Sequence, residues 1–364
     1  VPAWQRVTLP DGARAASLAA DGGTLLVGGT IGSGTGGGGQ TSDDDAPRLF
    51  VVRSGSVAGD VALSPADPNA AAASLVSLTV SDGRVYAIGK MVGGAHANPR
   101  LTVWDGSAAG GLASHPQEFF TFGGHDAGPL LGTAVVNGRP VIFGSRTSAS
   151  GTIGLLWTRT HQTWTQQDAV PALTSSADRE LGFGALAQQG ERLVVAGDEV
   201  GLLGGLNQRP AVFVGSVRGP WTEALLPEPD DLAAVSGQLS RATSIACPAT
   251  GTTCWAAGWV RGHPVAWPVT TGGATTSGET TTGSPITLPG DPAAGTDPVA
   301  VATIAAGRPL VFTNAAAPTL QLGCPDGWRD LGAPPAGVSA AAVVEADLYA
   351  IAGEDLWRAD APRC

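Results

Sequence analysis

Two adjacent carboxylates, Asp198 and Glu199, are the first candidates for chemistry in this sequence. They follow Gly197 at the end of an apolar run, so we expect them in a loop between two strands. A pair of carboxylates can act as general acid and base or can bind a cation. The alternative is a solvated acidic loop, and the sequence leaves both interpretations open.

Three arginines recur at equivalent places, each just before a strand: Arg14, Arg179 and Arg241. Each guanidinium presents a planar fork of donors, so three of them around one axis could bind an anion. The alternative is structural, with each arginine paired to a carboxylate or carbonyl of a neighbouring segment.

An aromatic candidate is Trp259, which follows Gly258 in a predicted loop and has Arg261 and His263 close behind it. Sugars stack on exposed indoles, so these three residues predict a platform for a glycan. The alternative is that Trp259 packs between strands, as we expect for the other tryptophans.

The remaining polar motifs are weaker. His125 precedes Asp126 and would be a general base only beside a nucleophile, and no Gly-x-Ser-x-Gly motif supplies one. The five histidines have no metal-binding spacing. The run at 43–45 is Asp-Asp-Asp, which could hold Ca²⁺ or simply add charge to a loop. We therefore expect no cofactor and no catalytic set.

The elements that must position these residues are short strands in a repeat. A run of small and apolar residues, a turn and a second apolar run occur seven times, at 15–28, 75–89, 133–144, 184–197, 243–258, 300–314 and 340–353. The turns contain Asp82-Gly83 and Asn137-Gly138, which favour two-residue hairpin loops. The period of roughly 40 to 60 residues is that of propeller blades. A third strand follows in most copies.

A fourth strand runs from tryptophan to proline, at 164–171, 221–227 and 328–334, and again at 4–10. The seventh copy ends without such a strand, so the N-terminal Trp4-to-Pro10 segment should complete it. The prediction is an all-β, seven-bladed β-propeller, one domain over 1–364 with blade boundaries near 11, 70, 128, 178, 238, 296 and 336. Closing the ring removes exposed sheet edges.

Bulk composition excludes some functions. The net charge of −11 leaves no basic stripe for nucleic acid, and the same charge disfavours an anionic membrane surface. No apolar run is long enough for a transmembrane helix, so we expect no membrane insertion. Cys247 and Cys254 flank a turn-rich loop and suit a local disulfide, which leaves Cys324 and Cys364 as the other pair. Paired cysteines and a start at Val1 without methionine predict a mature, secreted or cell-surface protein.

One stretch resembles a known family. Residues 155–164, which end in Thr160-His-Gln-Thr-Trp164, are similar to the Asp-box repeats of sialidase-like propellers, especially the secreted propellers of high-GC Gram-positive bacteria. Eroded copies end at Trp221 and Trp328. The resemblance implies a propeller fold, but sialidase chemistry also needs an exposed tyrosine, and the two tyrosines, Tyr86 and Tyr349, lie inside apolar strands.

Propeller ligand sites gather on the face that carries two kinds of connection. One joins the second and third strands of a blade, and the other joins the fourth strand to the next blade. We call it the loop-bearing face. The sequence favours a non-catalytic binding or scaffold module that recognises a surface glycan or a partner protein through this face. The alternative is a sialidase-like glycoside hydrolase or polysaccharide lyase using Asp198, Glu199, His125 and the arginines.

Overall fold

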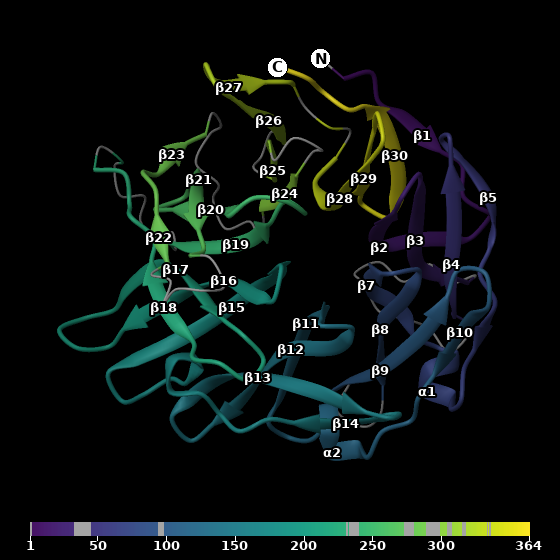
Figure 1. The fold of residues 1–364 in the computed structure, drawn as a ribbon, viewed down its shortest axis with the longest axis horizontal. Helices are drawn as coiled ribbons and strands as arrows, with labels where there is room; N and C mark the ends of the chain where they lie inside the picture. The colour runs from purple at the N-terminus through teal and green to yellow at the C-terminus, as the bar shows by residue number, and fades with distance from the viewer. Residues whose placement is uncertain are drawn as a thin grey trace.

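The computed structural model describes residues 2–32, 45–93, 98–230, 232, 240–272, 280–288, 299–303, 308–314, 318–332, 334 and 336–364. Over these ranges seven sheets stand around one axis, antiparallel except for the parallel pair β6–β10, and the two ends of the chain meet at one blade (Figure 1). The predicted seven-bladed all-β propeller is confirmed. No helix within the described ranges is long and apolar enough to cross a bilayer.

The first four blades follow the chain in order. Blade 1 is β2 (Ala13–Asp21), β3 (Thr24–Ile31), β4 (Ala46–Arg53) and β5 (Ser56–Asp60). Blade 2 is β7 (Ser74–Ser81), β8 (Arg84–Gly93), β9 (Asn98–Ser107) and β10 (Gly111–Ser114), with β6 (Leu63–Ser64) added outside β10. Blade 3 is β11 (Ala127–Val136), β12 (Arg139–Ser148), β13 (Gly151–Thr160) and β14 (Thr163–Gln166). Blade 4 is β15 (Arg179–Gln189), β16 (Arg192–Gly201), β17 (Asn207–Gly215) and β18 (Thr222–Leu225).

The last three blades complete the ring. Blade 5 is β19 (Arg241–Ala246), β20 (Thr253–Val260) and β21 (His263–Thr270), with β22 (Thr281–Thr282) and β23 (Ile286–Thr287) both paired to β21. Blade 6 is β24 (Val299–Thr303), β25 (Pro309–Thr313), β26 (Thr319–Cys324) and β27 (Gly327–Asp330). Blade 7 is β28 (Val338–Val344), β29 (Asp347–Ala352), β30 (Asp355–Asp360) and the N-terminal β1 (Gln5–Val7). The described helices are single turns, α1 (Pro68–Ala71), α2 (Phe119–Phe122) and the 3₁₀ turn η1 (Pro171–Leu173).

The ring is closed at β1, as the repeat pattern predicts. β1 pairs antiparallel with β30, with Gln5 opposite Arg358 and Val7 opposite Leu356. The first strands of successive blades contact one another all the way round, from β2 through β28 and back to β2. Their small side chains allow this close approach at the axis.

Tryptophans of the fourth strands pack against the preceding blade, which confirms their predicted place between blades. Trp221 lies against Phe143 with ring centroids 5.9 Å apart, and Trp328 against Trp255 at 5.6 Å. Trp4, next to β1, lies 6.4 Å from Phe312 of blade 6. Each of these three tryptophans therefore packs its blade against the one before it.

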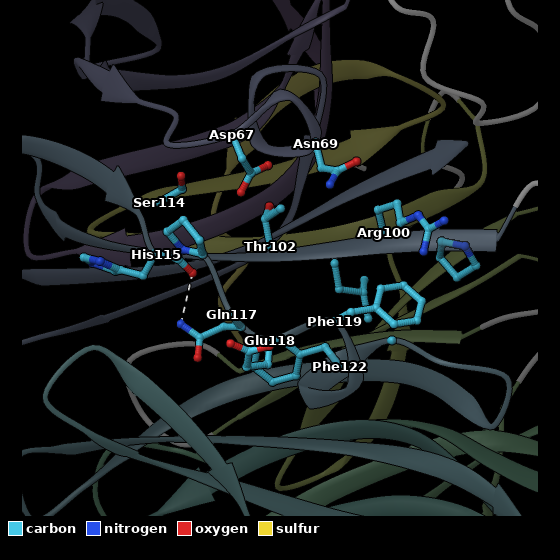
Figure 2. Close-up of a pocket in the computed structure, with 14 residues that line it drawn as sticks. Asp67, Asn69, Arg100, Thr102, Ser114, His115, Gln117, Glu118, Phe119 and Phe122 are labelled. Carbon is cyan, nitrogen blue, oxygen red and sulfur yellow. Dashed lines mark hydrogen bonds between the residues drawn. The ribbon is translucent and has the colours of Figure 1, made fainter. Parts of the chain in front are cut away.

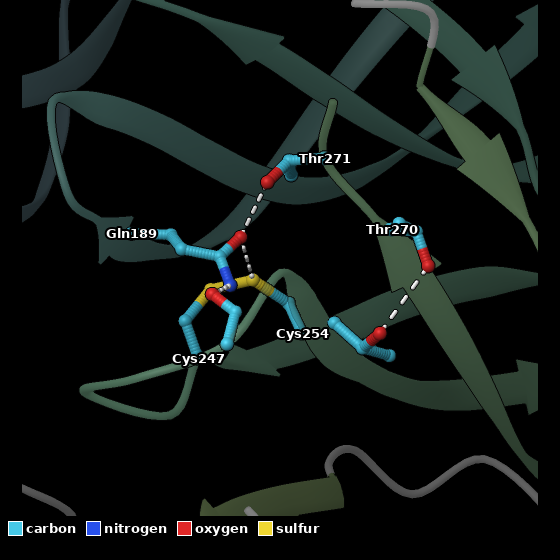
Figure 3. Close-up of a disulfide and its surroundings, with 7 residues drawn as sticks. Gln189, Cys247, Cys254, Thr270 and Thr271 are labelled. Atoms are coloured by element: carbon cyan, nitrogen blue, oxygen red, sulfur yellow. Dashed lines mark hydrogen bonds between the residues drawn. A yellow bond between two sulfur atoms is a disulfide. The ribbon is translucent and has the colours of Figure 1, made fainter. Parts of the chain in front are cut away.

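Both predicted disulfides are present, Cys247–Cys254 and Cys324–Cys364. The second ties the C-terminal residue to β26 of blade 6, beside the ring closure. The first closes the loop between β19 and β20 (Figure 3). Gln189 of blade 4 lies next to it, where its Nε2 donates to the Gly251 carbonyl at 2.9 Å and its Oε1 accepts from Thr271.

Replacing both Cys247 and Cys254 by serine is expected to lower the free energy of unfolding by about 2 kcal/mol, because the disulfide closes a short loop. The variant should remain a folded monomer, since the bridge lies away from the ring closure. Urea unfolding of both proteins at neutral pH, without added thiol, measures the difference. A variant that fails to fold would mean that the bridge has a larger role than loop closure.

Candidate functional site

Asp198 and Glu199 lie inside β16, which corrects the predicted loop position. The reason is Gly197, which does not end the strand. A Cβ at Gly197 would stand 2.0 Å from the Gly182 carbonyl oxygen, where β15 has a bulge. Glycine at such a place allows close backbone approach in the middle of a strand. Because successive side chains of a strand face opposite sides, Asp198 and Glu199 cannot act as one catalytic pair.

Glu199 is held by arginines. Arg209 Nη2 lies 2.7 Å from Glu199 Oε1, and Arg179 Nη1 lies 3.2 Å from Glu199 Oε2. Arg179 also pairs with Glu223. Burial alone would raise the pKa of Glu199, but hydrogen bonds from Arg209 and Arg179 bring it below its usual range. Glu199 is therefore a stable anion within an ion-pair network rather than a group that exchanges a proton.

Asp198 is half-buried on the other side of β16. Its Oδ2 accepts from Gln208 Nε2 at 2.6 Å, and its carboxylate occupies the space that a Cβ at Gly182 would take. Burial raises the pKa of Asp198, although the Gln208 hydrogen bond and the charge of Arg241 act against the rise. Glycine at 182 thus makes room for this carboxylate.

The three arginines do not form an open anion-binding ring. Arg14 Nη2 lies 2.6 Å from Asp45 Oδ1, and the Asp45 carboxylate is inaccessible to solvent. Arg179 is paired within blade 4, and Arg241 is close enough to Asp198 to lower its pKa. Each guanidinium is thus associated with a carboxylate, which corresponds to the structural alternative.

The predicted glycan platform of blade 5 is not exposed. Trp259 lies within β20, not in the loop, and only 5% of it is accessible, packed with Leu288 and with Val311 of blade 6. Gly258 explains the error, since its missing Cβ accommodates the Arg241 carbonyl oxygen. Arg261, in the turn that follows, lies 3.1 Å from Glu228 Oε2. His263 begins β21 and is half-buried.

The remaining candidate residues are not brought together in one site. His125 is fully exposed, and its Nδ1 lies 3.0 Å from the exposed Asp126 carboxylate. Of the acidic run at 43–45, positions 43 and 44 lie outside the described residues. Within the described ranges no three His, Cys, Asp or Glu side chains are grouped as a metal ion would require. Tyr86 and Tyr349 are both buried in strands, at 6% and 1% exposure, so neither is an accessible nucleophile.

A pocket that the sequence did not reveal lies on the loop-bearing face beside blade 2. We call it the blade 2 pocket (Figure 2). Three segments form it: the connection that contains α1, the first half of β9, and the connection that leads into α2. Its volume is about 190 Å³. It lies at the outer edge of the ring, near α1 and α2, rather than at the axis (Figure 1). No sequence motif marks it, because its residues come from three separate segments of the chain.

Some side chains of the blade 2 pocket are fixed by the fold. Gln117 donates to the Gln162 carbonyl at 2.8 Å and accepts from the Trp164 amide at 2.9 Å, which attaches this connection to blade 3. Ser114 Oγ accepts from the Ala66 amide at 2.7 Å, and Thr102 Oγ1 accepts from Trp104 at 3.0 Å. These bonds make the walls of the pocket rigid.

The polar groups of other side chains in the pocket remain available to a ligand. Within the described part of the chain, the side chains of Asn69 and Glu118 have no hydrogen-bonding partner, and Arg100 has no carboxylate partner. Arg100 stacks over Phe119, with Cζ 5.1 Å from the ring centroid. Phe119 is 52% exposed at the rim. The pocket therefore combines a donor, an amide, a carboxylate and an exposed aromatic ring.

Known proteins resemble this chain only in fold. No family model matches the sequence, and no curated protein matches it. The Dos1 propeller is similar with a TM-score of 0.56 at 8% identity, over 98% of this chain and 93% of that one. A Lactobacillus plantarum protein is similar with a TM-score of 0.51 at 12% identity, over 90% and 88%. The α-L-arabinanase of Penicillium chrysogenum, solved with arabinobiose, has a TM-score of 0.46 at 10% identity, over 78% and 91%. The first two of these matches support the fold, and the similarity to Asp-box propellers stays a prediction.

Proposed function

We propose that the protein is an extracytoplasmic, non-catalytic binding module that recognises a neutral sugar of a surface glycan in the blade 2 pocket. The observation that carries this proposal is the set of side chains with spare hydrogen-bonding capacity around the exposed ring of Phe119. Asn69 and Arg100 can donate to sugar hydroxyls, and Glu118 can accept from them. An aromatic ring at the rim offers an apolar surface to the C–H face of a sugar.

The size and charge of the pocket define the ligand class further. A volume of about 190 Å³ corresponds to roughly six water molecules, so the pocket takes one sugar ring rather than a chain. Asp67 and Glu118 line it together with Arg100, and two carboxylates against one guanidinium disfavour an anionic ligand. The two disulfides support an oxidising compartment outside the cytoplasm.

Hydrolysis receives less support from the arrangement of carboxylates. Asp198 and Glu199 project from opposite sides of β16, and Arg179 and Arg209 hold Glu199 as an ion pair. A glycosidase needs two carboxyl groups facing one bond. In the blade 2 pocket, Asp67 Oδ1 accepts from the Ala70 amide as the N-cap of α1, which leaves Glu118 as the carboxylate for a ligand, so binding without turnover is the function that we favour.

Replacing Arg100 by alanine is expected to weaken binding of the recognised sugar about tenfold, because one charge-assisted hydrogen bond and the packing on Phe119 are lost together. A glycan array identifies the sugar, and titration calorimetry with the corresponding monosaccharide measures the change. Replacing exposed Arg363 by alanine, at the other end of the chain, removes the same charge and should leave the affinity unchanged. An array without any specific ligand, or release of sugar from a glycoside substrate, would contradict the proposal.

A further inference from the structure

A second and larger pocket lies between blades 3 and 4, on the face opposite the loop-bearing one. We call it the blade 3–4 pocket. It is built from the turns between first and second strands, at Asn137 and Glu191, and from the turn before β18 that carries Arg218. Its volume is about 470 Å³, within the range of small-molecule sites. It shares no lining residue with the blade 2 pocket.

The charges of this pocket are unusual for so acidic a protein. Arg139 and Arg218 both line it, and neither has a carboxylate partner among the residues that the structure describes. The whole chain has 31 acidic residues for 20 basic ones, so most guanidinium groups are expected to find a carboxylate. Two that remain unpaired at one cavity leave it with positive charge. The single carboxylate in its lining, Glu191, offsets only part of that charge.

A third arginine of the lining serves the fold instead. Arg159 Nη1 lies 3.0 Å from Asp105 Oδ2 of blade 2, and its Nε donates to the His161 carbonyl at 2.5 Å. It is only 13% exposed and therefore forms a fixed wall. The cations that remain for a ligand are Arg139 and Arg218.

Neutral hydrogen-bonding groups surround these two arginines. Gln167 Nε2 donates to Thr158 Oγ1 at 2.7 Å. The Thr158 hydroxyl proton and the Gln167 side-chain oxygen Oε1 are therefore still available to a ligand. Asn137 is held in a tight turn with φ +52°. The apolar side chains of Val136 and Val217 lie in the same lining. Such a mixture suits a ligand with an anionic group, several hydroxyls and an apolar ring face.

We propose that the blade 3–4 pocket binds a sugar acid, with the ligand carboxylate between Arg139 and Arg218. Guanidinium groups bind carboxylates through paired, charge-assisted hydrogen bonds. The hydroxyls of the sugar then meet Asn137, Thr158 and Gln167. The protein would thus hold two saccharide units on opposite faces of the ring, a neutral one at blade 2 and an acidic one here.

Titration calorimetry with trigalacturonic acid tests the proposal, with a neutral galactose trisaccharide and inorganic phosphate as comparison probes. Changing Arg139→Gln or Arg218→Gln should each weaken trigalacturonate binding about tenfold. Glu191→Gln should strengthen it several-fold, because a like charge is removed from the pocket. All three positions are exposed, so these variants should fold normally. Arg363→Gln, with the same change of charge outside the pocket, should have no effect.

The proposal would be overturned by absent trigalacturonate binding or by phosphate binding as tight as that of the sugar acid. It would also be overturned by equal binding of the neutral trisaccharide in the Arg100→Ala variant, or by no response to Arg139→Gln, Arg218→Gln or Glu191→Gln. Tighter binding of a glutamate-rich peptide than of trigalacturonate would also overturn it, in favour of a protein ligand. The outcome is independent of the blade 2 pocket, because the two pockets share no lining residue and Arg100→Ala should weaken binding only at blade 2. Failure at one pocket therefore leaves the other proposal intact.

Discussion

Deleting residues 1–10 is expected to abolish the monomeric fold rather than to shorten a tail. The deletion removes β1, and with it the pairing partner of β30. Val7, only 4% exposed, packs with Leu356 and Tyr349 in the core between blades 7 and 1. Burial of one such side chain contributes about 1.5 to 3 kcal/mol, and Trp4 is lost as well. A typical domain is stable by only about 5 to 15 kcal/mol.

The deletion also leaves the six-residue β30 as the unpaired edge of blade 7, in place of the three-residue β1. Such an edge pairs readily with another chain, so we expect aggregates or oligomers. Thermal unfolding and light scattering measure both effects. Removal of residues 1–3 alone is the control, because it keeps Trp4 and β1 and should behave as the full chain does. If the longer deletion stays monomeric with an unchanged melting temperature, ring closure by β1 is not important for stability.

The fold could be predicted because each blade repeats the same local sequence pattern. Apolar runs alternate with turns such as Asp82-Gly83, whose positive φ values of +49° and +71° confirm the expected hairpin geometry. The N-terminal strand could be assigned because it repeats the tryptophan of other fourth strands. β6 could not be predicted, because it has only two residues and forms a strand only by pairing with the distant β10. The same holds for the single-turn helices α1 and α2.

The candidate sites were predicted less well, and one cause accounts for two of the errors. Gly197 and Gly258 were interpreted as strand ends, yet both lie inside strands opposite bulges, where a Cβ would collide with a backbone oxygen at 2.0 Å. Residues thought to be in loops, Asp198, Glu199 and Trp259, therefore face neighbouring strands or blades. A single sequence does not distinguish a glycine that ends a strand from one that accommodates a bulge. The two pockets were missed because each combines turns from different blades.

The ion pairs around Asp105 join blades 2 and 3 in the interior of the ring. Asp105, on β9, is 7% exposed at its side chain and pairs with Arg84 and His115 of blade 2. Arg159 of blade 3 lies 3.0 Å from Asp105 Oδ2. Burial alone would raise the pKa of Asp105, but the hydrogen bonds and charges of Arg159 and His115 hold it below its usual range. The carboxylate is therefore shared between two arginines and a histidine.

Replacing Asp105 by asparagine is expected to lower the free energy of unfolding at neutral pH by about 3 to 5 kcal/mol, because the buried Arg159 guanidinium loses its counterion. The effect depends on pH in a defined direction. Since the folded pKa is lowered, the stabilisation is present above the unfolded pKa of about 3.9 and is lost as the pH falls through the folded value. The difference between wild type and variant should therefore be large at pH 7 and smaller at strongly acidic pH. Urea unfolding at both pH values measures it.

The control for this prediction is Asp326, whose carboxylate lies 2.8 Å from Arg329 Nη2 at the surface of blade 6. Hydrogen bonding from Arg329 also lowers the pKa of Asp326, but the carboxylate is 66% exposed. Water and salt screen such a pair, so Asp326→Asn should leave the unfolding curve unchanged. A loss at Asp105 no larger than at Asp326 would contradict the prediction, because burial between the blades would then add nothing to an ordinary surface ion pair.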